Sequence, residues 1–224
     1  MGISAQDVKK LRDESGAGIM DCKNALVEAN GDFDAASDIL RKKGAAKVGK
    51  KSSRVTAEGL IAIKATGNAA AMVEVNCETD FVARESAFID FVNTLAEVAL
   101  STKAKDVDAL NRANMPSGET VDATRQALIT KIGENMQVRR VTYIESTGLI
   151  AAYSHGARIG VLVDLASGDA ETAKDIAMHV AAAAPQFVKP EDVPADVVAK
   201  EKEIQLQIAI DSGKPAEIAE KMVT

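Results

Sequence analysis

The 224-residue sequence is poor in aromatic residues and in the residues from which catalytic centres are built. Aromatic side chains make up 3% of the chain and tryptophan is absent, so platforms on which nucleic-acid bases could stack are scarce. The two cysteines, Cys22 and Cys77, form neither a disulfide framework nor a zinc site. No metal-ligand spacing, nucleophile elbow or dinucleotide fingerprint occurs. We therefore expect no catalytic residue, no metal and no cofactor.

Long apolar runs and a positive net charge are also missing. No uninterrupted apolar segment approaches the ~20 residues that a membrane span needs. The N-terminal sequence MGISAQDVKK has neither a hydrophobic signal core nor an Arg-rich transit pattern. The net charge is −6, which argues against a wide nucleic-acid surface. The sequence predicts a cytoplasmic protein with reduced thiols that binds no membrane and no specific nucleic acid.

The pattern of residues 1–44 predicts a small module of three helices. Ser4 and Asp7 form a variant of the capping box before an apolar periodic run. The turn at residues 15–18 contains two glycines, which end the first helix, and Asp32 is suited to cap the third. A domain of about 40 residues is only marginally stable by itself. We therefore expect this module to be an appended partner-binding unit.

A basic segment follows this module. Residues 41–54 contain seven basic residues and no acidic one, so residues 45–56 are expected to be a solvated linker. The segment supports an alternative function, an RNA- or ribosome-binding protein. Residues 44–50 also fit G-x-x-x-x-G-K, but a helix is expected before them, and Lys51 stands where a phosphate-binding loop needs Ser or Thr. Direct nucleotide binding is therefore not expected.

The middle of the chain contains a duplicated unit. The sequence GLIA at residues 59–62 recurs at residues 148–151, and Asp80 recurs as Asp169, each 89 residues later. Each copy has the pattern of a β-hairpin followed by a helix. We therefore expect an α+β fold in which antiparallel sheets carry helices on one face. Core subdomain N is expected over residues 57–146 and core subdomain C over residues 147–188.

The pattern of residues 189–224 predicts a helical hairpin. Three prolines between residues 185 and 194 form a spacer, and a periodic apolar run that includes Ile204 and Ile208 predicts a helix. The sequence SGKP at residues 212–215 predicts the turn into a second helix. Because the chain ends at Thr224, this second helix is short, and we expect part of the first helix's apolar face to lack a partner.

An acidic turn at residues 74–84, EVNCETDFVAR, separates a predicted strand from a predicted helix and contains an aromatic residue. One interpretation makes Asp80 the N-cap and folds Phe81 onto its own helix as a hydrophobic staple. The other interpretation points Phe81 outward, toward a partner. A thiol enzyme that uses Cys77 is a further alternative, but an adjacent carboxylate such as Glu78 raises the pKa of a thiol and reduces its thiolate fraction.

Several stretches resemble a known family. LRDESGAGIMDCKNAL at residues 11–26 and EVNCETDFVAR at residues 74–84 closely resemble the signature segments of bacterial translation elongation factor Ts. KIGENMQVRR, HGARIGVLV, IAMHVAAAAPQFV and SGKPAEIAEKMV are similar to further stretches of that family, so the resemblance covers nearly the whole chain. Ser15 stands where the family more often has Thr, and longer members continue past the last stretch. The resemblance implies a guanine-nucleotide exchange factor that binds the GTPase elongation factor Tu and releases its GDP.

The resemblance also implies which residues meet this partner. The segment that would contact elongation factor Tu and disturb its Mg²⁺ site consists of Thr79, Asp80, Phe81 and Val82. In this segment the rigid, apolar ring of Phe81 is suited to enter between helices of the partner. The three-helix module and the second hairpin are implied to make further contacts through Leu11, Arg12, Met20 and His155. Leu11 and Met20 are equally suited to the core of their own module.

Overall fold

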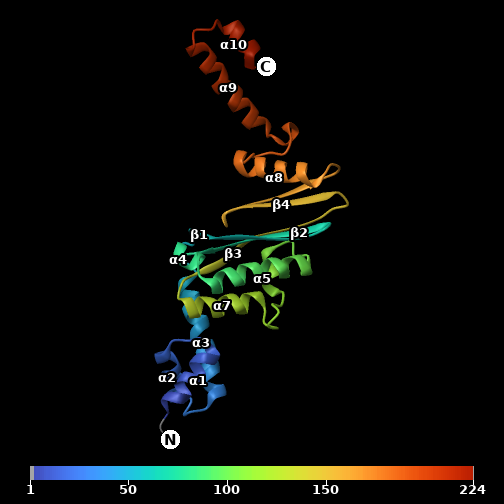
Figure 1. Ribbon diagram of the computed structural model, residues 1–224. Coiled ribbons are helices and arrows are strands. Elements are labelled where there is room, and N and C mark those ends of the chain that lie inside the picture. Colours follow the sequence, from blue (N-terminus) through green and yellow to red (C-terminus); the bar gives the residue numbers. More distant parts are fainter. Residues whose placement is uncertain (1–2, 224) are drawn as a thin grey trace. The chain divides into compact units, whose positions relative to one another are not determined.

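The computed structural model describes residues 3–223, which form two compact units with an α+β fold (Figure 1). The units are Met1–Ala182 and Ala183–Thr224. The first unit contains a three-stranded and a two-stranded antiparallel sheet together with helices, and the second unit is helical. The predicted α+β class is therefore confirmed.

The three predicted N-terminal helices are present. Ser4 and Asp7 form the predicted capping box, because the hydroxyl of Ser4 accepts from the Asp7 backbone N–H at 3.1 Å and the Asp7 carboxylate accepts from the Ser4 N–H at 3.0 Å. Gly16 ends the first helix in the left-handed conformation, with φ +65°. Leu11 and Leu26 are among the fully buried side chains that join these helices. The helices are α1 (Ala5–Ser15), α2 (Ile19–Glu28) and α3 (Phe33–Lys51).

The predicted linker over residues 45–56 is wrong in its first half, because α3 continues to Lys51. The cause is an apolar stripe at four-residue spacing, formed by Leu40, Gly44 and Val48, all of which are buried. A Cβ at Gly44 would lie 3.1 Å from the Thr130 hydroxyl, so this glycine lets α3 approach its neighbour closely rather than ending the helix. Basic residues of this segment, among them Lys50 and Lys51, therefore stand on a helix, and the RNA-binding alternative loses its flexible linker.

The main sheet has the order β1-β2-β3, with antiparallel neighbours. Its strands are β1 (Glu58–Thr66), β2 (Ala69–Cys77) and β3 (Met136–Glu145). Alternate residues of β2, among them Val73 and Val75, are buried in one core with Phe88 and Leu95 of the following helix. The helices that contribute to this core are α3, through Val48, together with α4 (Asp80–Ala83), α5 (Ser86–Thr102), α6 (Val107–Arg112) and α7 (Val121–Ile132).

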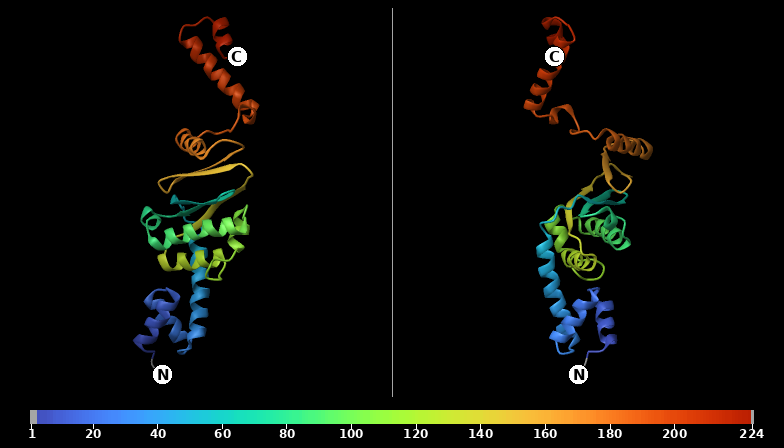
Figure 2. Two further views of the ribbon diagram at one scale, coloured as in Figure 1. Left: turned by 45° about the vertical axis from the view of Figure 1, so that its right-hand side comes forward. Right: turned by 90° about the vertical axis from the view of Figure 1, so that its left-hand side faces the viewer.

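The second hairpin consists of β4 (Leu149–His155) and β5 (Ile159–Leu165), and α8 (Ala170–Ala183) follows it. It lies on the face of the main sheet away from α5 and α7 (Figure 2). Gly160 makes this approach possible, because a Cβ there would lie 2.7 Å from both Ile61 Cγ2 and Met72 Sδ. The backbone N–H of Ile61 donates to the carbonyl oxygen of Ala157 at 2.7 Å, which fixes the turn of the hairpin to the edge strand β1.

The two hairpins share a structural feature at the repeated GLIA sequence. A Cβ at Gly59 would lie 2.3 Å from the Val75 carbonyl oxygen, and a Cβ at Gly148 would lie 2.1 Å from the Leu165 carbonyl oxygen. In both copies, a glycine is therefore required where the first strand passes close to the end of its partner strand. This shared constraint explains why the glycine recurs in the sequence.

The second unit contains the predicted helical hairpin. Its two helices contact each other through small residues, of which Ala209 and Ala219 are buried. Gly213, with φ +84°, makes the turn between them. As expected, several apolar side chains remain exposed, among them Ile204 and Ile208. The elements are η1 (Pro190–Asp192), α9 (Ala195–Asp211) and α10 (Ala216–Val223).

Across residues 3–223, none of the helices combines the length and the apolar character that crossing a membrane would require.

The close approach of the second hairpin to the main sheet predicts the effect of a single methyl group. Gly160→Ala should lower the free energy of unfolding by about 1–3 kcal/mol, because the new Cβ would overlap Ile61 and Met72. Gly67→Ala is the matched control, since no atom lies within 4 Å of a Cβ at this turn. Urea denaturation followed by circular dichroism measures both, and equal stability of the two variants would contradict the described packing.

Candidate functional site

Phe81 lies in the segment between β2 and α5, residues 78–85, which is called the Phe81 loop below. Its side chain is 82% exposed, whereas the next two residues, Val82 and Ala83, are buried in the main core. The one-turn helix α4 is thus attached to the protein through Val82 and Ala83, and the ring lies in solvent. Of the two interpretations, the one in which Phe81 folds onto its own helix as a staple is therefore excluded, and the ring points outward.

Thr79, and not Asp80, caps this helix. The Thr79 hydroxyl accepts from the backbone N–H of Val82 at 3.4 Å. Asp80 is the first helical residue, and its carboxylate lies 3.1 Å from the guanidinium of Arg84. Because both of these charged groups are substantially exposed, the pair contributes little to stability. The carboxylate of Asp80 therefore remains accessible beside the ring.

Glu134 holds Thr79 from a distant part of the sequence. One carboxylate oxygen accepts from the Thr79 backbone N–H at 3.1 Å, and the other accepts from its hydroxyl at 2.7 Å. Hydrogen bonds to an ionised acceptor are stronger than those between neutral groups. Sequence reasoning missed this residue, although it lies in the family-like stretch KIGENMQVRR, because nothing local relates Glu134 to Thr79.

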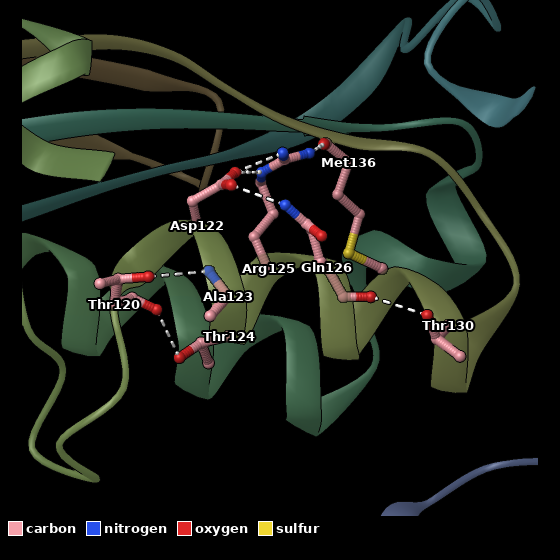
Figure 3. Close-up of polar contacts among 8 residues, drawn as sticks. All are labelled: Thr120, Asp122, Ala123, Thr124, Arg125, Gln126, Thr130 and Met136. Atoms are coloured by element: carbon pink, nitrogen blue, oxygen red, sulfur yellow. Dashed lines mark hydrogen bonds and ion pairs between the residues drawn. The ribbon is translucent and has the colours of Figure 1, made fainter. Parts of the chain in front are cut away.

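The loop that carries Glu134, residues 133–135, is fixed at both ends. Gly133 ends α7 in the left-handed conformation, with φ +94°. On the other side, Arg125 of α7 donates to the Met136 carbonyl oxygen at 2.8 Å and is oriented by Asp122 at 2.5 Å (Figure 3). The first residue of β3 is thus bonded to α7. Glu134 therefore lies in a short loop whose two ends are both held by α7.

Asn135 connects the same loop to two further segments. It is buried, and its backbone N–H donates to the Glu78 carboxylate at 2.5 Å. Its side-chain amide donates to the carbonyl oxygen of Arg54 at 3.0 Å, and more weakly to that of Ser52 at 3.4 Å. The chain that follows α3, the turn after β2 and the loop after α7 therefore meet at one buried asparagine.

Cys77 lies beneath the loop as a structural thiol. It is fully buried and donates to the carbonyl oxygen of Thr79 at 3.2 Å. Burial, together with the nearby carboxylates of Glu134 and Glu58, raises the pKa of this thiol to about 11. A group that stays protonated and enclosed at neutral pH is a poor nucleophile. The geometry therefore gives no support to a thiol enzyme that uses Cys77.

The candidate contacts of the N-terminal module divide into buried and exposed residues. Leu11 is fully buried in the core of the module, so its prediction as a partner contact is corrected. Arg12 is exposed, and Met20 is 60% exposed. Met20 shares the surface of α2 with exposed Ile19 and Val27. Two of the three candidates in this module are thus accessible.

His155 is exposed at the end of β4, where its Nδ1 lies 3.1 Å from the hydroxyl of Tyr153. The turn that follows it is close to the loop of Phe81. A cavity of about 320 Å³ is lined by Ala83 and Arg84 on one side and by Ala157 on the other. The structure therefore brings the hairpin turn and the Phe81 loop to the same edge of β1.

The described residues form neither a metal site nor a phosphate-binding loop. Within residues 3–223, no group of three or more His, Cys, Asp or Glu side chains is arranged to hold a metal ion. The G-x-x-x-x-G-K match at residues 44–50 lies inside α3, so it does not form the strand-to-helix loop that cradles phosphate. An exposed aromatic ring on an anchored loop is instead typical of a protein that acts by binding another protein.

Comparisons with known proteins identify the family. The model of the family "Elongation factor TS" matches residues 78–224. Elongation factor Ts of Idiomarina loihiensis is 55% identical over 223 residues, which cover 100% of this chain and 76% of the relative. The protein of the same name from Psychromonas ingrahamii is 57% identical over 99% of this chain and 75% of its own length. The chain belongs to the elongation factor Ts family.

The contribution of the Thr79 hydroxyl to stability can be tested by an isosteric substitution. Thr79→Val should lower the free energy of unfolding by about 1 kcal/mol, because it removes both the cap of α4 and one donor to Glu134. Thr79→Ser keeps the hydroxyl and is the control. Thermal unfolding followed by circular dichroism makes the comparison, and a valine variant as stable as the serine variant would contradict the described contacts.

The raised pKa of Cys77 predicts a dependence of stability on pH. The unfolded thiol ionises near its ordinary pKa of 9.0, whereas the folded thiol stays protonated to about 11. The stabilising contribution is therefore complete below pH 9 and is lost as the pH rises toward 11. Urea titrations of the wild type and of Cys77→Ala across this pH range should show that the free energy of unfolding falls more steeply with pH in the wild type. Parallel curves for the two proteins would show that folding does not raise the pKa of the thiol.

Proposed function

We propose that the chain is a guanine-nucleotide exchange factor, not an enzyme in the usual sense, which binds elongation factor Tu in the cytoplasm and promotes release of GDP. Membership of the elongation factor Ts family supports this role. The single observation that carries the mechanism is the 82% exposure of the Phe81 ring on an anchored loop.

The mechanism follows from linkage between two binding equilibria. A GTPase holds GDP through contacts to its phosphates and to a bound Mg²⁺. A partner that binds the nucleotide-free GTPase more tightly than the GDP-bound form weakens GDP binding by the same factor. The exchange factor therefore needs a contact that fits only the rearranged, empty state, and it needs no nucleotide pocket of its own.

The ring of Phe81 is suited to this contact. It is large, apolar and rigid, so an apolar pocket between helices of the partner would bury most of it. Entry of the ring would move those helices away from the Mg²⁺ side of the nucleotide. Asp80 remains accessible beside the ring and would accept hydrogen bonds from the partner. Val82 is buried in the main core, so its predicted direct contact with the partner is corrected, and with Thr79 it would support the contact from beneath.

Further contacts are proposed at Arg12, Met20 and His155. The exposed apolar surface of α2 gives Met20 a setting typical of protein interfaces. His155 precedes the turn that lies at the same edge of β1 as the Phe81 loop. These residues would position the exchange factor on its partner, so their individual effects should be smaller than that of Phe81.

Phe81→Ala should slow the stimulated release of GDP from elongation factor Tu by roughly 30-fold, because a buried aromatic anchor at an interface contributes about 2 kcal/mol or more. The release of a fluorescent GDP derivative in stopped flow measures this rate. The melting temperature should not change, because the ring makes few contacts within its own protein.

Val188→Ala is the control, since Val188 is an exposed apolar residue in the other compact unit. It should release GDP at the wild-type rate. A Phe81→Ala protein that is as fast as the wild type would show that the ring is not the contact that drives release. A wild-type chain that leaves GDP release unchanged would refute the exchange function as a whole.

A further inference from the structure

We propose that Glu134 is a positioning residue for exchange, which acts through Thr79 to hold the ring of Phe81 in its outward orientation. This inference rests on the proposed function. Its basis is the pair of hydrogen bonds by which the two carboxylate oxygens of Glu134 engage both polar donors of Thr79, at 3.1 and 2.7 Å.

The helix that carries Phe81 cannot hold its own conformation. It has four residues, which is a single turn, and such a short helix is unstable in isolation because nucleation is costly. Its attachments are the buried side chains of Val82 and Ala83 below it and the contacts of Thr79 at its start. Apolar burial is not directional, so it fixes depth better than rotation. The two hydrogen bonds to Glu134 are directional, and they are stronger than the hydrogen bond that the Cys77 thiol donates to the Thr79 carbonyl oxygen.

The position of Glu134 makes it a suitable anchor. The loop of residues 133–135 is held by the left-handed Gly133 and by the bond from Arg125 to the Met136 carbonyl oxygen. Its acceptor oxygens are therefore fixed relative to α7 and β3. Thr79 is in turn fixed at both its N–H and its hydroxyl. The hydroxyl also accepts from Val82, so the constraint extends into the helix that carries the ring.

Loss of Glu134 should lower the fraction of molecules in which the ring has the orientation that the partner needs. The Thr79 donors would turn to water, and the loop would sample other orientations at little cost. Only a complex whose ring has that orientation can go on to release GDP, so the maximal rate of release should fall in proportion to that fraction. The remaining contacts with the partner would be intact, so the first encounter should be affected less than the release step.

The test is a double-mutant cycle on the full chain with four proteins: wild type, Phe81→Ala, Glu134→Ala and the double variant. The release of a fluorescent GDP derivative from elongation factor Tu is measured over a range of factor concentrations. Glu134→Ala should lower the maximal rate by at least about tenfold, because it removes both charge-assisted hydrogen bonds to Thr79, while the half-saturating concentration changes less than about twofold. Residues that act as one unit are non-additive, so the double variant should match Phe81→Ala.

Two further variants separate positioning from general stability. Glu134→Gln keeps one acceptor oxygen and should restore part of the rate. Glu97→Gln is the matched control, because Glu97 pairs with Lys64 on the surface at 2.6 Å, away from the loop, and should keep the wild-type rate. Circular dichroism confirms that each variant is folded, and if Glu134→Ala is not, Glu134→Gln takes its place in the cycle.

The possible outcomes distinguish this inference from the proposed function. If Phe81→Ala slows release but Glu134→Ala does not, or if the two effects multiply in the double variant, Glu134 is not a positioning residue for the ring. A Glu134 variant that changes the melting temperature but leaves the release rate unaltered excludes the positioning role as well. If Phe81→Ala itself releases GDP at the wild-type rate, the failure lies in the proposed role of the ring.

Discussion

The two carboxylate oxygens of Glu134 hold the backbone and the hydroxyl of Thr79 across 55 residues of sequence, and the proposed mechanism depends on this contact. In that mechanism, the contact fixes the start of the one-turn helix and so holds the ring of Phe81 in its outward orientation. Leaving a phenylalanine in solvent forgoes about 1.5–3 kcal/mol of burial. In the same segment of chain, Phe88 and Phe91 are buried. The exposure of Phe81 is therefore a local exception in a well-packed domain.

Much of the fold was predictable because its determinants are local. The capping box at Ser4, the glycines that end helices and the two-residue turn at Gly67 each act over a few residues. The duplicated hairpin was also predictable, since the glycine at the start of GLIA is required at the same position in both copies. Local signals of this kind are visible in a single sequence.

The errors arose where contacts between distant segments decide the structure. The basic composition of residues 41–54 indicates a linker, yet Gly44 packs closely against Thr130 and the helix continues to Lys51. Leu11 lies in a helix whose exposed side was expected to meet a partner, but it faces the inside of its own module. Thr79 rather than Asp80 caps α4, and its N–H and hydroxyl also donate to the distant carboxylate of Glu134. Neither periodicity nor propensity encodes such pairings.

In the proposed mechanism, the outward ring of Phe81 makes the protein prefer an empty GTPase. The most direct measurement is the ratio of two dissociation constants, one for nucleotide-free and one for GDP-loaded elongation factor Tu, determined for the wild type and for Phe81→Ala. We expect the wild type to bind the nucleotide-free form far more tightly than the GDP-loaded form. In the variant, the ratio of the two dissociation constants should be at least about tenfold closer to one. An unchanged ratio in the variant would contradict the account.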